Sequence, residues 1–294
     1  MDTIVRVKAK KINIIILLAL LSFLLFAFTP RSTVNKPSRP FTISLPLNYK
    51  TSTSNPLVIL LPGYSKDSTY LQKTLFPTKE SQKNLVLVTP LASKDKLGNY
   101  FWNSKGACCN FFNSTVNDIA YLNQLTKYLK VKYHIDENKI FFLGHSNGGF
   151  MALTMACQNP NLYAGVISIA GAGNINPKLC KPKTPTSILQ IHGTNDEVIN
   201  FQGGNLQGSV YPSAQTNLNR WIKIDKCLVP PSTLLLDLVD ALPGEETQAE
   251  KYLCSNSTLV ELWAIKAGAH TPEINGNFMP AIFNYLANNS SKNS

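Results

Sequence analysis

The feature that most constrains this chain is the run GHSNGG at positions 144–149. An apolar segment, KIFFL, precedes it at Lys139–Leu143, and a helical pattern follows over Asn147–Cys157. A G-x-S-x-G motif between a strand and a helix is a nucleophile elbow, in which a strained turn lifts the serine out of the sheet. The pattern predicts Ser146 as a nucleophile; the alternative is a glycine-rich turn with an ordinary serine.

Apolar runs that end in turn residues predict the strands around this elbow. They lie at 41–45, 56–61, 84–89, 139–143, 164–170, 187–191 and 259–265. Little alternation within most of them indicates strands buried on both faces, which is typical of a parallel sheet. Helical patterns at 116–133, 147–157, 213–224 and 280–287 lie between the strands. The expected fold is therefore α/β: a single α/β-hydrolase domain over 41–287 with a mostly parallel, doubly wound sheet. The pattern of 225–258 assigns no element.

A serine hydroxyl needs a base, and the chain has only four histidines. His134 lies before the KIFFL strand, so it is expected at the opposite end of the sheet from the elbow. His145 is expected to point away from the nucleophile, and His192 to pack beneath the site. His270 alone follows the last strand and precedes the closing helix, which fits the order serine, acid, histidine in α/β-hydrolases. His270 is the predicted base.

The acid of such a triad follows a late strand and precedes the histidine. Asp196 comes just after the strand Ser187–Ile191 and meets both conditions. Its carboxylate would accept the second ring N–H of the base and fix the tautomer. Asp225, Asp237 and Asp240 are rivals within the unassigned segment, and an ordinary turn is the alternative role for Asp196.

Ester hydrolysis also needs N–H donors for the charge that develops on the attacked carbonyl oxygen. One donor is expected from Asn147, the residue after the nucleophile. The other is expected from the loop after an early strand, where LPGY stands at 61–64 and Tyr64 offers its N–H. The Tyr64 ring could equally be a plain pocket wall.

The chain resembles the polyhydroxybutyrate depolymerase and feruloyl esterase group of secreted α/β-hydrolases. The matching pieces are LPGY (61–64), WNSKGACCNFFNSTVNDIAYL (102–122), GHSNGG (144–149), HGTND (192–196) and GAHT (268–271). The resemblance implies a serine esterase with Ser146, Asp196 and His270 as its triad. It implies no cofactor, and its substrate would be a small ester, a polyester or a plant cell-wall ester.

Two departures from that group concern the substrate. Pro62-Gly63 stands where the group usually has His-Gly, and Pro272 follows His270-Thr271 where the group usually has Trp. The missing tryptophan would belong to the substrate cleft, so polymer or feruloyl specificity does not carry over with the triad. A non-catalytic binding or adhesion protein of the same fold is the alternative function.

The N-terminal residues have the pattern of a targeting segment. Basic residues through Lys11 precede an apolar run over 12–28, so residues 1–30 are predicted to be an export signal or a membrane-tethering signal anchor. The expected location is secreted or periplasmic. Residues 31–40 are rich in Pro, Ser and Thr and are predicted as a linker, and 288–294 as a disordered tail.

The net charge of +11 raises the question of a nucleic-acid partner. Seven of the 28 basic residues lie within the first forty, against one acidic residue. No basic run with interleaved aromatics occurs beyond them, so no nucleic-acid partner is expected.

All six cysteines follow the predicted signal, which favours disulfides in an oxidising compartment. Cys227 and Cys254 are the favoured pair, because both fall in the late segment. Cys108 and Cys109 are adjacent and are expected to reach different partners. No C-x-x-C pair is present and the histidines lack zinc spacing, so no metal site is predicted.

Overall fold

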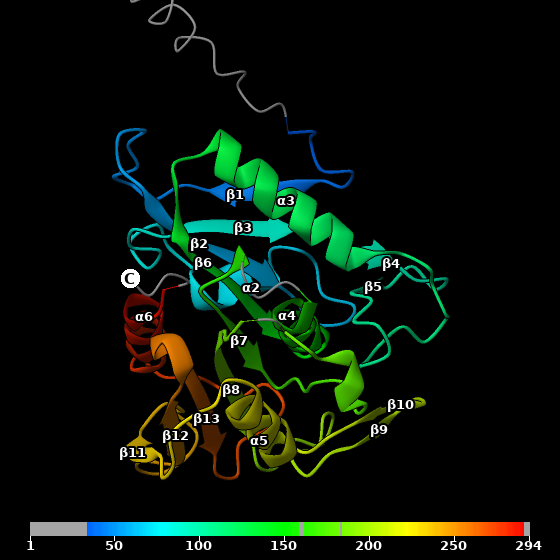
Figure 1. The fold of residues 1–294 in the computed structure, drawn as a ribbon, viewed down its shortest axis with the longest axis vertical. Coiled ribbons are helices and arrows are strands. Elements are labelled where there is room, and N and C mark those ends of the chain that lie inside the picture. The colour runs from blue at the N-terminus through cyan, green and yellow to red at the C-terminus, as the bar shows by residue number, and fades with distance from the viewer. Residues whose placement is uncertain (1–33, 159–161, 183, 291–294) are drawn as a thin grey trace, which may run out of the picture. The chain divides into compact units, whose positions relative to one another are not determined.

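The structure is a computed structural model that describes residues 34–158, 162–182 and 184–290 (Figure 1). The description below concerns the unit Asn35–Ser294. The predicted export signal at 1–30 lies outside the described residues. Among the residues that are described, no helix combines the length and the apolar character needed to cross a bilayer.

A nine-stranded sheet forms the centre of the domain, in the order β1-β3-β2-β6-β7-β8-β13-β12-β11. The six strands from β3 to β13 in this order run parallel, and β1 is antiparallel to β3 at one edge. At the other edge β12 is antiparallel to β13, and β11 is antiparallel to β12. The prediction of a mostly parallel sheet is confirmed. The strands are β1 (Phe41–Ser44), β2 (Asn55–Leu61), β3 (Val86–Pro90), β6 (Ile135–His145), β7 (Gly165–Ile169), β8 (Ser187–Gly193), β11 (Ser232–Leu236), β12 (Thr247–Leu253) and β13 (Leu259–Ile265).

Helices cover both faces of the sheet, as the doubly wound prediction requires (Figure 1). On β2, Leu57 and Ile59 pack in the cluster that contains α3, α4 and α5, whereas Val58 and Leu60 pack in the cluster that contains α2 and α6. The helices are α2 (Tyr70–Leu75), α3 (Asp118–Lys132), α4 (Asn147–Gln158), α5 (Ala214–Ile224) and α6 (Phe278–Asn288). Shorter elements are β4 (Ser93–Lys94), β5 (Tyr100–Phe101), β9 (Gly204–Leu206), β10 (Ser209–Tyr211), η2 (Pro177–Leu179) and η3 (Ser255–Ser257).

The segment that the sequence left unassigned extends the sheet. Residues 232–236 and 247–253 form β11 and β12, and β12 pairs with β13 along its whole length. The outermost strand, β11 (STLLL), is mostly exposed and does not alternate apolar with polar residues. Sequence periodicity therefore carries no signal there, because strand pairing and not side-chain burial places β11.

The disulfides confirm one prediction and correct another. Cys227 pairs with Cys254, as expected. Cys157 pairs with Cys180, at the end of α4 and after η2. Cys108 and Cys109 bond to each other, so the prediction of different partners was wrong. The other four cysteines form the two remaining disulfides, so no free thiol is left for Cys108 or Cys109 to pair with. Both residues are buried beside each other and bond there.

The structure describes part of the predicted linker and the first residues of the predicted tail, and both contact the domain. Arg39, within the predicted linker, forms an ion pair with the buried carboxylate of Asp118, and its guanidinium lies 3.8 Å from the centre of the Tyr121 ring. At the other end, α6 continues through Asn288, and the buried side chain of Asn289 donates to the Tyr285 carbonyl. The folded domain thus includes Arg39 and residues 288–290, because polar contacts hold them.

Candidate active site

Ser146 sits on the tight turn between β6 and α4. Its φ is +54°, a left-handed value that non-glycine residues adopt only under constraint. Two glycines permit the turn: a Cβ on Gly148 would lie 1.7 Å from the Leu61 carbonyl oxygen, and one on Gly144 would lie 2.0 Å from the Gly148 oxygen. The Ser146 N–H donates to the Ile169 carbonyl at 2.8 Å, which ties the turn to β7. This is the geometry of a nucleophile elbow.

Asp196 and His270 meet through a direct hydrogen bond. The ring Nδ1 of His270 lies 2.8 Å from Oδ2 of Asp196. The other carboxylate oxygen accepts the backbone N–H groups of Val198 and Ile199, at 2.9 and 2.8 Å. The fixed carboxylate therefore orients the His270 ring and leaves Nε2 as the nitrogen that can take a proton.

The electrostatics of this pair favour an ionised acid. Burial by itself would raise the pKa of Asp196, but hydrogen bonds from His192 and His270, the charge of His270 and the Ile199 amide outweigh it. They hold the pKa of Asp196 below its ordinary value. Nε2 of His192 lies 3.3 Å from the carboxylate and 2.7 Å from the Ile199 carbonyl. His192 thus packs beneath the site, as predicted.

Ser146 and His270 line one cavity of about 380 Å³. Tyr64, Cys109 and Phe111 line it too, and Val198 and Leu206 add apolar surface. Asp196 lies behind His270 with no side-chain surface exposed. The structure thus brings together the three residues that the sequence selected for nucleophile, base and acid.

The two expected oxyanion donors lie in different settings. Asn147 is the first residue of α4, so its N–H has no acceptor within the helix. Tyr64 lines the cavity, its hydroxyl donates to Asp95, and its ring meets Phe111 edge-on with ring centres 5.3 Å apart. The Tyr64 ring is therefore a fixed pocket wall, and its backbone N–H stays the predicted donor.

Trp102 connects both sides of the predicted oxyanion site, a role that the sequence motifs did not indicate. Its backbone N–H donates to Oδ1 of Asn147 at 2.7 Å, and its carbonyl accepts from Nδ2 of Asn147 at 2.9 Å. Its indole N–H donates to the Pro62 carbonyl at 3.1 Å. Trp102 heads the motif WNSKGACC, and this position was the available signal.

His145 was expected to point away from the site, but the structure places its ring beside His270. The ring centres are 4.9 Å apart, and Nε2 of His145 lies 3.1 Å from the His270 carbonyl oxygen. Burial lowers the pKa of His145 to about 4, so the ring is neutral near pH 7. A neutral donor at this point holds the His270 loop without placing a second positive charge beside the base.

The remaining candidates lie elsewhere. Asp225 ends α5, Asp237 accepts from the Asn275 amide, and Asp240 is exposed. His134 directly precedes β6, at the far end of that strand from Ser146. Across the described ranges, no group of three or more His, Cys, Asp or Glu side chains could hold a metal ion.

Comparison with known proteins adds family and fold information. The family model for phospholipases and carboxylesterases matches residues 109–222. A feruloyl esterase B from Piromyces equi is 27% identical over 177 residues, covering 58% of this chain and 31% of that protein. A feruloyl esterase D from Neurospora crassa is 22% identical over 259 residues, covering 83% and 78%.

A bifunctional acetylxylan esterase/xylanase from Neocallimastix patriciarum is 27% identical over 150 residues. The match covers 51% of this chain but 20% of that protein. The chain thus spans less than a third of the length of this relative and of the Piromyces equi enzyme.

Solved structures show the fold. An acetyl xylan esterase from Aspergillus awamori superposes with a TM-score of 0.62 at 14% identity, covering 87% of this chain and 96% of that one. A thermostable esterase superposes with a TM-score of 0.54 at 16% identity, covering 85% and 59%. With the mostly parallel sheet and the helices on both faces, these likenesses show that the described residues of the unit Asn35–Ser294 have the α/β-hydrolase fold.

Proposed function

We propose that this protein is an exported serine hydrolase of carboxylic esters. One observation carries the proposal: the strained-turn Ser146 lines the same cavity as His270, whose second ring nitrogen is bonded to the buried Asp196. The matched phospholipase/carboxylesterase model and the esterase relatives support the same reaction class.

The geometry supports a two-step mechanism. Oγ of Ser146 attacks the ester carbonyl while Nε2 of His270 takes its proton, and Asp196 stabilises the imidazolium that forms. The N–H groups of Tyr64 and Asn147 hold the oxyanion. His270 then protonates the leaving alcohol, and a water molecule, deprotonated by His270, hydrolyses the acyl-enzyme on Ser146. The reaction needs no cofactor.

For the substrate, we infer an acyl ester of the plant cell-wall type. Relatives named as feruloyl and acetylxylan esterases support this class. Phe111, Val198 and Leu206 supply apolar cavity surface for an acyl group. Hydroxybutyrate polyesters are the second substrate class to test, because the sequence motifs also resemble those of polyhydroxybutyrate depolymerases.

Export is also part of the proposal. Three disulfides suit an oxidising compartment, and the apolar run at 12–28 fits a signal or a membrane tether. Whether the run is cleaved is a separate question, which N-terminal sequencing of the exported protein answers.

The first test is the turnover of p-nitrophenyl acetate and butyrate by the purified, disulfide-bonded protein, with Ser146→Ala as the matched control. We expect the substitution to reduce kcat by roughly 10⁶-fold, because it removes the nucleophile. Feruloyl esters, acetylated xylan and hydroxybutyrate oligomers would follow as substrates. Equal rates for the two folded proteins would refute the esterase proposal and favour a binding role for the domain.

A further inference from the structure

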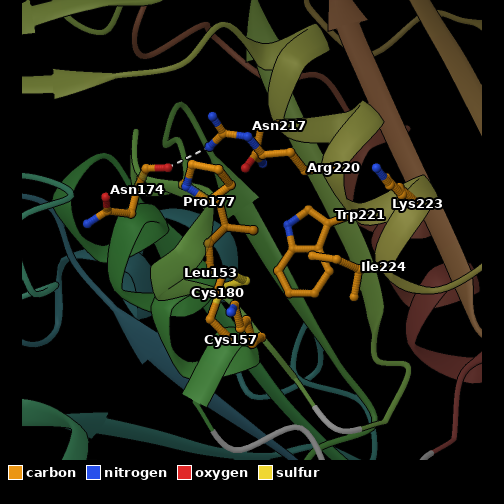
Figure 2. Close-up of a pocket in the computed structure, with 12 residues that line it drawn as sticks. Leu153, Cys157, Asn174, Pro177, Cys180, Asn217, Arg220, Trp221, Lys223 and Ile224 are labelled. Carbon is orange, nitrogen blue, oxygen red and sulfur yellow. Dashed lines mark hydrogen bonds between the residues drawn. A yellow bond between two sulfur atoms is a disulfide. The ribbon is translucent and has the colours of Figure 1, made fainter.

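A second cavity lies between α4, α5 and the loop that follows β7 (Figure 2). Its volume is about 390 Å³, close to that of the cavity at Ser146, and the two share no lining residue. This volume lies within the range of small-molecule sites in proteins. Nothing in the proposed esterase mechanism uses it.

One residue that lines the cavity, Trp221, offers a hydrogen-bond donor, its indole N–H. Trp221 as a whole residue is 2% exposed, and within the described ranges no group accepts its indole N–H. The indole nitrogen is not among the fully enclosed polar atoms that lack a partner, so solvent in the cavity reaches it. The other two tryptophans are satisfied: Trp102 donates to the Pro62 carbonyl at 3.1 Å and Trp263 to the Glu261 carboxylate at 3.0 Å. A ligand that enters the cavity and carries an acceptor can take the place of this solvent at the indole N–H. Figure 2 shows the indole nitrogen on the side of the ring that faces Pro177 and Leu153.

The charged groups at this cavity are all positive. Lys181, Arg220 and Lys223 line it, and no Asp or Glu belongs to its described lining. Arg220 also shapes the cavity, since its guanidinium donates to the carbonyls of Asn174 and Ile175 at 2.6 and 2.9 Å. The loop after β7 is thereby tied to α5. Two flexible lysines remain at the cavity to meet an anion.

The walls below these charges are apolar. Leu153 from α4, Ile224 from α5 and Pro177 from the loop line the cavity, together with the Cys157–Cys180 disulfide and the Trp221 ring. An inorganic anion would leave this surface uncovered, whereas a molecule with an apolar body would bury it. The lining therefore fits a single molecule that carries both a negatively charged group and an apolar part.

We propose that this cavity binds a small organic carboxylate with an apolar body. A carboxylate oxygen accepts the Trp221 indole N–H, Lys181 and Lys223 supply the opposite charge, and the apolar body fills the space between Leu153 and Ile224. The inference does not depend on the proposed esterase activity, because the two cavities are built from different residues.

The test is a titration of the full ¹⁵N-labelled protein with phenylacetate, followed through the indole N–H signals of its three tryptophans. Trp221→Phe assigns the Trp221 signal. We expect phenylacetate to shift that signal saturably, because the indole gains an acceptor, while the signals of Trp102 and Trp263 stay in place. Neutral 2-phenylethanol is the matched probe without charge, and it should bind at least tenfold more weakly.

A double variant Lys181→Gln/Lys223→Gln tests the charge. We expect the dissociation constant for phenylacetate to rise at least fivefold, while Lys132→Gln on the exposed surface of α3 leaves it unchanged. No saturable shift at Trp221 would overturn the proposal. Equal binding of the alcohol, or a response at Trp102 alone, would also overturn it, since the first removes the role of the carboxylate and the second places the ligand at the other cavity.

Discussion

Asp196 and Asp225 are both buried carboxyls, with 2% and 0% of their surface exposed. Asp196 accepts two backbone N–H groups and the His270 ring, and the pKa of its carboxyl is held low. Asp225 accepts the Thr186 N–H at 3.4 Å, and its Oδ1 has no partner among the described groups. Burial, only weakly opposed by that bond, raises the pKa of Asp225 to about 7.

The difference shows that burial alone does not make a catalytic acid. A buried carboxylate stays ionised only where donors replace the water that it has lost. Asp196 has these donors because its turn directs successive N–H groups at it. Asp225 ends α5 without them and is largely protonated below pH 7. Exchanging each carboxyl for an amide separates the two roles.

Within this comparison of the two carboxyls, the largest expected effect is that of Asp196→Asn on catalysis. The amide cannot stabilise the His270 imidazolium and favours the wrong ring tautomer, so kcat for p-nitrophenyl butyrate should fall by roughly 10⁴-fold. Steady-state kinetics at pH 8 measures the effect. Asp225→Asn is the matched control and should stay within about twofold of the parent. A similar loss in both variants would show that stability, and not orientation of the base, explains the result.

The next largest effect is a gain in stability, in contrast to the loss of activity in Asp196→Asn. At pH 8 Asp225 is ionised in the folded protein, and this lowers the free energy of unfolding because the folded pKa of Asp225 lies above the ordinary value of 3.8. Asp225→Asn removes that charge and should raise the unfolding free energy at pH 8 by about 1–3 kcal/mol. Urea unfolding at pH 8 and pH 5 checks this. A gain of the same size at pH 5, where Asp225 is already neutral, would contradict the explanation.

The smallest effect concerns the pH profile of stability. Between pH 4 and 6.5, His145 binds a proton in the unfolded chain but stays neutral in the folded protein. Its contribution therefore makes the free energy of unfolding rise with pH. Asp225 holds a proton in the native state up to about pH 7, so it makes stability fall with pH over the same range. The two slopes oppose each other, and the parent protein should change little.

In Asp225→Asn the contribution of His145 is no longer opposed. The free energy of unfolding of this variant should therefore rise by about 1 kcal/mol from pH 4.5 to 6.5. Adding His145→Gln should then flatten the profile. Urea unfolding at four pH values within this range measures both. A flat profile in the single variant would contradict the low pKa of His145.

The sequence predicted the main strands and helices because each carries an apolar period or run. It favoured Asp196 over Asp225 because Asp196 directly follows a predicted strand, whereas Asp225 lies in the unassigned segment. The physical distinction, the N–H groups of Val198 and Ile199, comes from a turn geometry that residue types do not encode. The contact of Trp102 with Asn147 joins residues 45 positions apart, so no local pattern predicts it. The catalytic roles themselves stay predictions until the kinetics are measured.

The ion pair of Arg39 with Asp118 has a consequence for where the chain can be shortened. Asp118 also accepts the Asn103 N–H at 2.7 Å, so it links the start of α3 to the loop that leads to the Cys108–Cys109 pair. A protease that trimmed the chain at the first residue of β1, Phe41, would remove the arginine and leave a buried carboxylate without its cation. We therefore expect a recombinant protein that begins upstream of Arg39 to be more stable than one that begins at Phe41.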